Sequence, residues 1–210
     1  MGVFNGNLSY ARYFVEGDLP EEEFRETLLK RIQQYAIPEL TLDNEDEEVS
    51  GWACIEDLLD VDFEIEKVFQ LEYILLSFRI DRWKVPPTLL KAHLLKAERQ
   101  FLLENDREKI TKRERDLLKE QVKLSLKKQL LPSLSVYDLC WHPDQKVLRF
   151  WSHSARVNEY MVELFEKTFG LSLVPFSAYT WAETLGLSED DLLKMADLES
   201  EPYAELPEDE

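Results

Sequence analysis

Residues 68–81 read VFQLEYILLSFRID and carry the strongest β-strand signal in the chain. Apolar, β-branched and aromatic side chains dominate this run, which is long enough for one long strand or for one arm of a hairpin. Pro86 and Pro87 end the strand and open a helix over about 88–104, because proline lacks a backbone donor but is tolerated in the first helical turn. The sequence therefore predicts a sheet strand that leads directly into a helical segment.

A second long helix is predicted over 108–131, where apolar and charged residues recur at helical spacing. Two strands follow at about 134–141 and 146–152. The link between them contains Pro143 and Asp144, which is turn chemistry, so these strands are expected to form a β-hairpin. Hairpins of this kind favour antiparallel pairing.

The flanking regions alternate strands and helices in the same way. We expect an α+β fold in which a mixed, largely antiparallel sheet carries the two long helices and further flanking helices. Residues 1–187 form this α+β region, with 86–131 as a candidate arm, and 188–210 are expected to be a flexible acidic tail. The remaining predicted elements are a strand at 7–16, a helix from Pro20 to just before Pro38, a strand at 51–55, a helix at 155–168 capped by Gly170, a strand at 171–176 and a short helix near 180–186.

Composition restricts the class of protein. The 210 residues are 44% hydrophobic, which is enough to bury a sizeable core. Cys54 and Cys140 lie far apart and form no CxxC pair, as expected of a reducing compartment. No run approaches the roughly 20 apolar residues that a membrane span needs, and the first residues lack a secretory signal. We expect a cytoplasmic protein that does not enter a membrane.

Charge is distributed unevenly along the chain. The formal net charge is −18, yet residues 79–128 hold 15 of the 25 Lys and Arg and eight of the 43 Asp and Glu. Within 108–131, cations recur every three or four residues and are expected to form a basic ridge on one helix face, because side chains at this spacing are neighbours. Such a ridge is a candidate for DNA phosphates. The predicted DNA-binding residues are Lys112, Arg113, Arg115, Lys119, Lys123 and Lys127, with Lys91, Lys96 and Arg99 on the preceding helix.

An apolar stripe is expected to dock the helix 108–131. Its members recur every seven residues, at Ile110, Leu117, Leu124 and Leu131, with Leu118 and Val122 beside them. An alternative for the ridge is a solvated face whose cations pair within the helix. The acidic partners in that alternative are Glu114, Asp116 and Glu120.

Catalytic chemistry has weak support. The alternating carboxylates Asp60, Asp62, Glu64 and Glu66 would share one face of a strand and could resemble the metal cluster of a nuclease. Solvated carboxylates are the commoner reading. Three possible metal ligands around the hairpin turn, Cys140, His142 and His153, lack a fourth and are expected to be structural. We therefore expect no enzyme activity, no metal and no cofactor.

Several short blocks resemble the recombination-associated RdgC proteins. They occur in the same order as in that family and cover about residues 8–187. The blocks are Gly51-Trp52, Tyr73–Arg79 (YILLSFR), Lys84–Pro86 (KVP), the basic helix with Leu118–Val122 (LKEQV), Leu130–Pro132 (LLP), Leu148–Ser154, Leu164–Gly170, Leu173–Pro175 (LVP) and Tyr179–Trp181 (YTW).

This resemblance implies a non-enzymatic protein that binds single- and double-stranded DNA with little sequence preference. The family forms ring-shaped homodimers around duplex DNA and restrains recombinase, so DNA, a second copy and a recombinase are the expected partners. Family members extend further at the C-terminus, in a region that helps to close the ring. We expect a nucleoid-associated homodimer built through sheet edges or through the faces of the apolar strand 68–78 and the hairpin 134–152. An alternative is an acidic interaction module that binds a recombinase or nuclease directly, with residues 41–48 and the tail imitating DNA.

Overall fold

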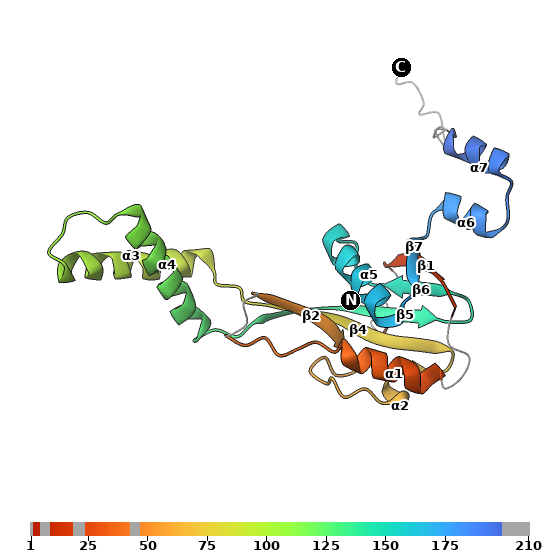
Figure 1. Cartoon of the computed structure of the whole chain (residues 1–210), viewed down its shortest axis with the longest axis horizontal. Helices are drawn as coiled ribbons and strands as arrows, with labels where there is room; N and C mark the ends of the chain where they lie inside the picture. Colours follow the sequence, from red (N-terminus) through yellow and green to blue (C-terminus); the bar gives the residue numbers. More distant parts are fainter. Residues whose placement is uncertain (1, 5–8, 19–23, 43–46, 199–210) are drawn as a thin grey trace, which may run out of the picture.

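A computed structural model of the chain describes residues 2–4, 9–18, 24–42 and 47–198. These residues form seven helices and a seven-stranded antiparallel sheet, which confirms the α+β class (Figure 1). The strand order is β2-β4-β5-β6-β1-β7, and β3 pairs with β4. The strands are β1 (Ala11–Glu16), β2 (Glu48–Ala53), β3 (Phe69–Gln70), β4 (Tyr73–Arg82), β5 (Ser133–His142), β6 (Val147–Phe150) and β7 (Ser172–Pro175). The helices are α1 (Phe24–Gln34), α2 (Ile65–Val68), α3 (Pro87–Glu104), α4 (Lys112–Lys127), α5 (Ala155–Phe169), α6 (Ala178–Thr184) and α7 (Glu189–Ala196).

The stretch 68–81 forms a tight hairpin rather than one strand. Leu71 adopts a left-handed backbone, with φ of 56°, and the chain reverses there between β3 and β4. The second predicted hairpin is also present, because β5 and β6 pair across a turn in which the Lys146 amide donates to the Pro143 carbonyl at 3.0 Å. β4 and β5 are paired from Ile74↔Trp141 to Arg82↔Ser133 and form the centre of the sheet.

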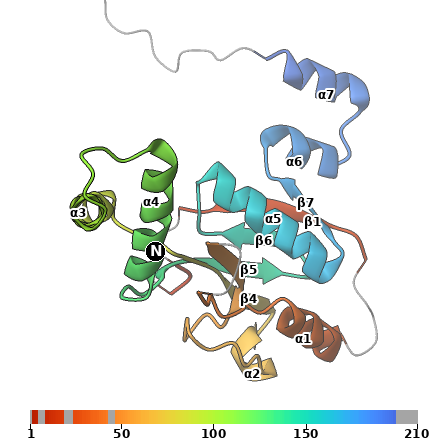
Figure 2. The same cartoon turned by 60° about the vertical axis from the view of Figure 1, so that its left-hand side comes forward.

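One face of the sheet carries the hydrophobic core. Alternate residues of β4, including Leu76 and Phe78, point to this face and are fully buried. α1 and α5 cover it together, contributing Ile32 and Phe165 (Figure 2). The core needs these two helices because half of each central strand is apolar and must be removed from water.

Gly51 marks a close approach of two backbone segments. A Cβ at this position would lie 2.4 Å from the Cα of Ile37, which leaves no room for a side chain. The Trp52 amide donates to the Tyr35 carbonyl, and the Ile37 amide donates to the Trp52 carbonyl. The Gly51-Trp52 pair therefore lets the segment after α1 lie against β2.

The central strands β4 and β5 are interior to the sheet. β4 and β5 each have a neighbour on both sides, and β4 side chains on the face opposite the core, such as Leu75 and Ser77, are also buried. The predicted interface through sheet edges or the faces of strand 68–78 and hairpin 134–152 stays a prediction. The edges of the sheet are β2 and β7, at the two ends of the strand order, and β3, which pairs with β4.

Several predicted boundaries shift. β2 begins at Glu48 rather than Gly51, since Glu48 lies opposite Arg82 in the register with β4. Predicted features at residues 7–8 and 20–23 lie outside the described residues. In the predicted tail, Glu189–Ala196 forms α7, with a first turn of three acidic residues, and the positions from 199 onward lie outside the described residues. Among the helices that the structure describes, none is long and apolar enough to cross a membrane.

Candidate nucleic-acid interface

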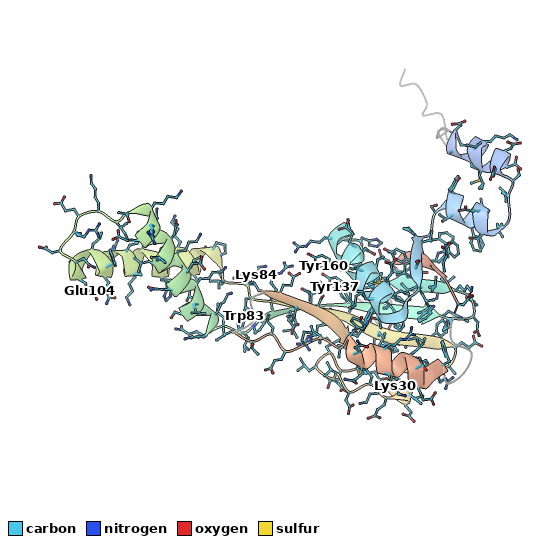
Figure 3. All side chains as sticks on the ribbon, in the orientation of Figure 1. Lys30, Trp83, Lys84, Glu104, Tyr137 and Tyr160 are labelled. Carbon is cyan, nitrogen blue, oxygen red and sulfur yellow. The ribbon has the colours of Figure 1, made fainter. Side chains whose placement is uncertain are left out.

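The two long helices form an arm that projects from the sheet. α3 leaves the end of β4 and α4 returns to the start of β5, so the arm extends from the centre of the sheet (Figure 1). In Figure 3, Glu104 lies at the tip of the arm, and Trp83 and Lys84 lie in the neck where the arm meets the body. The predicted helical pair is confirmed, although α4 is shorter than the predicted 108–131.

A capping box explains where α4 begins. The Thr111 hydroxyl accepts the Glu114 amide at 3.3 Å, and the Glu114 carboxylate accepts the Thr111 amide at 2.9 Å. Arg107 adds an ion pair to Glu114 at 2.6 Å. These contacts, led by the bond from the Thr111 backbone, lower the pKa of Glu114 to about 2. The residues before Thr111 therefore form the loop between the helices and not a first turn of α4.

The face of α4 that packs includes the flanking members of the predicted apolar stripe, Leu118 and Val122, but not its seven-residue repeat. Leu126 is buried, and Leu118 and Val122 are partly buried at the same four-residue spacing. By contrast, Leu117 is 59% exposed and Leu124 is 47% exposed. The seven-residue repeat was wrongly assigned as the docking stripe, because a heptad spacing marks one line on a helix without indicating whether a partner covers it.

Three of the predicted DNA-binding residues are engaged within the protein. Arg115 pairs with Glu98 of α3 at 2.6 Å. Lys123 and Lys127 both pair with Glu47, at 2.5 and 2.7 Å. The alternative of cations neutralised by carboxylates therefore holds for part of the ridge, but the partners come from other elements rather than from within α4.

The other predicted cations are exposed. Lys112, Arg113 and Lys119 lie on α4, and within the described part of the chain none of them has an ion-pair partner. The same holds for a second group on α3, which comprises Lys91, Lys96 and Arg99. Six of the nine predicted DNA-binding residues are therefore exposed cations without an ion-pair partner among the described residues, on a protein that is acidic overall.

A cleft of about 660 Å³ lies where the arm joins the body. Arg82 and Trp83 contribute from the end of β4, and Arg156 and Tyr160 contribute from α5. Both Arg156 side-chain nitrogens Nε and Nη2 donate to the Tyr160 hydroxyl, at 3.1 and 3.0 Å. The Trp83 indole N–H is buried and lacks a hydrogen-bond partner among the described residues. This cleft joins residues from distant parts of the chain and was not anticipated.

Glu48 is the ionic centre of the cleft. Its carboxylate forms an ion pair with Arg82 across the β2–β4 register and lies 3.8 Å from Arg156. Glu47, the preceding residue, accepts the Trp83 amide through its backbone carbonyl at 2.9 Å. Hydrogen bonds from Lys123 and then Lys127 lower the pKa of the Glu47 carboxyl below its ordinary value. Both glutamates belong to the acidic segment 41–48, but their pairing with these cations could not be predicted, since the partners lie at least 34 positions away.

The acidic run predicted as a possible nuclease cluster does not form a strand. Asp60 and Asp62 lie in a loop, Glu64 precedes α2, and Glu66 is in its first turn. Lys67 binds Asp60 at 3.0 Å and Glu64 at 3.3 Å, so a side-chain ammonium pairs with two of the four carboxylates.

The three residues around the hairpin turn have separate environments. Cys140 is buried, and burial is the main cause of its raised pKa. His142 Nε2 lies 3.3 Å from Glu72, and His153 Nε2 lies 2.6 Å from the Ser9 hydroxyl. Across the described ranges, no group of three or more His, Cys, Asp or Glu side chains is arranged to hold a metal.

Comparison of the sequence with protein-family models and with curated proteins yields no match. The resemblance to the RdgC proteins therefore depends on the short blocks alone and stays a prediction.

Proposed function

We propose that this protein binds DNA without sequence preference and that the arm supplies the contacts. The observation that carries the proposal is the group of six exposed, unpaired cations on a projecting helical hairpin. Lys and Arg contacts to phosphates are the same for every base sequence, so a surface of this kind attracts DNA without reading it. The negative charge of the body does not cancel this attraction, because charges beyond about 8–10 Å are screened at physiological salt. The attraction is therefore local to the arm.

The resemblance to the RdgC proteins supports a place in recombination or replication control. In this role the protein coats or encircles DNA and restrains a recombinase. The projecting arm can lie along a duplex without enclosing it, which suits coating. Encircling DNA would need a second copy of the chain.

Two copies of the chain associate in this proposal through the exposed leucines of α4. Leu117 and Leu124 are seven residues apart, as in the seam of a coiled coil. Arg113 and Glu120 flank them, so the surface carries both charge signs and can complement a second copy of itself. Pairing would place two arms on one DNA and raise the apparent affinity without new contacts.

Fluorescence anisotropy with labelled duplexes and single strands of unrelated sequence tests DNA binding. We expect similar affinities for all sequences and a steep fall in affinity between 50 and 200 mM salt, because counterions are released on binding. Six phosphate contacts correspond to a slope of about −5 in a plot of log affinity against log salt. A flat salt response, or no binding at low salt, would overturn the proposal.

A further inference from the structure

Two consecutive glutamates hold cations from three elements. Glu47 and Glu48 lie at the start of β2, next to the neck of the arm. Their carboxylates pair with Lys123 and Lys127 of α4, Arg82 of β4 and Arg156 of α5. Two anions therefore compensate four cations at the place where the arm meets the body.

The position of Glu47 resembles that of a bound phosphate. A single carboxylate oxygen, Oε1, accepts from both lysine ammonium groups, as a phosphate oxygen between two basic side chains would. The Glu47 side chain is 48% exposed, so this contact lies at the surface. Exposed ion pairs contribute little to folding and weaken as salt rises, so a polyanion can replace the carboxylate.

The cleft beside Glu48 would become basic if the two glutamates withdrew. Its charged lining consists of three cations, which are Arg82, Arg156 and Lys167, and three anions, which are Glu47, Glu48 and Glu163. Glu163 pairs with Lys167 at 2.6 Å, and these two residues together add no net charge to the lining. Arg82 and Arg156 would then be free beside the Tyr160 ring, continuous with Lys123 and Lys127 of the arm.

We propose that Glu47 and Glu48 are an autoinhibitory counter-ion: they occupy the places of DNA phosphates at the base of the arm and in the neck cleft. This inference rests on the proposed function, because it concerns the same DNA-binding surface. DNA phosphates displace the two carboxylates and gain up to four cations, which extends the contact surface from the arm to Arg82 and Arg156. The glutamates thus weaken binding and reserve it for a ligand of high charge density.

Anisotropy measurements on the full chain test the inference with Glu47→Gln, Glu48→Gln and the double variant. Glutamine keeps the size of glutamate and one acceptor oxygen, replaces the other oxygen with a donor NH2 group, and removes the charge. For the double variant we expect about a tenfold or greater gain in duplex affinity near 0.1 M salt, and a salt slope steeper by about two or more, at about 0.9 per added phosphate contact. Glu47→Gln alone frees only Lys123 and Lys127 and should give part of the gain.

A matched control separates a local effect from the change in net charge. Glu159→Gln/Glu166→Gln removes two charges from exposed positions on α5 that do not line the cleft. This control should bind DNA like the original protein. Adding Lys123→Gln/Lys127→Gln to Glu47→Gln should abolish the gain of that variant.

The outcomes distinguish the two proposals. If the original protein binds DNA and the double variant binds no better than the control, the counter-ion inference is wrong and the proposed function stands. If neither the original protein nor any Gln variant binds DNA at low salt, the proposed function fails and the inference fails with it. Circular dichroism of each variant identifies loss of fold, and Glu47→Gln, which changes only an exposed side chain, serves as the test if the double variant unfolds.

Discussion

The indole Nε1 of Trp52 donates a hydrogen bond to the hydroxyl of Thr168 across 2.9 Å, which connects β2 to α5 inside the core. Thr168 in turn donates to the Leu164 carbonyl at 2.7 Å. Both side chains are buried, so this contact fixes the helix that covers the sheet. It also sets the position of Arg156 and Tyr160, which lie on the same helix.

Replacing Thr168 with valine should destabilise the protein by about 1–3 kcal/mol, because the buried Trp52 N–H would lose its acceptor. Valine has nearly the same shape, so packing is retained. Urea unfolding followed by Trp fluorescence measures the change. Thr168→Ser keeps the hydroxyl and should cost about 1 kcal/mol, the contribution of one buried methyl group. An unchanged free energy of unfolding for Thr168→Val would show that the hydrogen bond contributes nothing.

Replacing Lys112 and Lys119 with glutamine should weaken DNA binding and reduce the salt slope by about two. Both lysines are exposed and lie away from the packed face of α4, so the free energy of unfolding should not change. Anisotropy at several salt concentrations measures the effect. Lys30→Gln, an exposed change on α1 far from the arm, is the control (Figure 3). An unchanged slope would move the contact to α3, where Lys96 and Arg99 are the candidates.

Replacing Leu117 and Leu124 with serine should convert a dimer into a monomer without unfolding the arm, since both leucines face solvent in the single chain. Light scattering at micromolar concentration measures the mass against the 24.8 kDa of one chain. Leu103→Ser, which alters an exposed leucine of α3, should leave the dimer intact. A monomeric original protein that still binds DNA tightly would refute the proposed association.

The capping box of α4 should make the stability of the arm decrease at low pH. The folded-state pKa of Glu114 is lowered to about 2 from an ordinary value of 4.5, so the stabilisation is present above about pH 4.5 and is lost as the pH falls towards 2. Helical circular dichroism during acid unfolding measures this loss. Glu114→Gln can still accept the Thr111 amide but does not titrate, so its acid loss should be smaller than that of the original protein. Identical acid profiles would rule out Glu114 as a contributor.

Local signals were sufficient for most elements of the fold. Gly170 adopts the left-handed conformation expected of a helix-ending glycine, with φ of 70°, and the Pro143-Asp144 turn joins two strands as predicted. The apolar, β-branched and aromatic residues of 68–81 correctly identified a strand. These features depend on neighbouring residues, and neighbours are visible in a sequence.

Features that depend on long-range pairing could not be predicted. The seven-residue repeat of leucines in α4 marks one side of the helix but does not show which element packs against it. The helix packs through Leu118 and Val122, which lie beside that repeat, and through Leu126. Lys123 and Lys127 have the spacing of an exposed basic ridge, yet both form ion pairs with Glu47. Glu47 lies 76 or more positions earlier in the chain, so the sequence does not reveal these pairs. Interior and edge strands likewise differ only once the order of the sheet is known.

The arm begins and ends at two residues that face each other. Arg82 and Ser133 are partners in the β4–β5 register, and the Ser133 hydroxyl donates to the Arg82 carbonyl at 3.2 Å. The chain thus leaves and re-enters the sheet at a single rung, as in an ordinary hairpin. Excision of residues 84–131 and closure with a short turn would leave every strand pairing in place. The arm is in this sense a module that can be removed, transplanted or lengthened while the body keeps its connectivity.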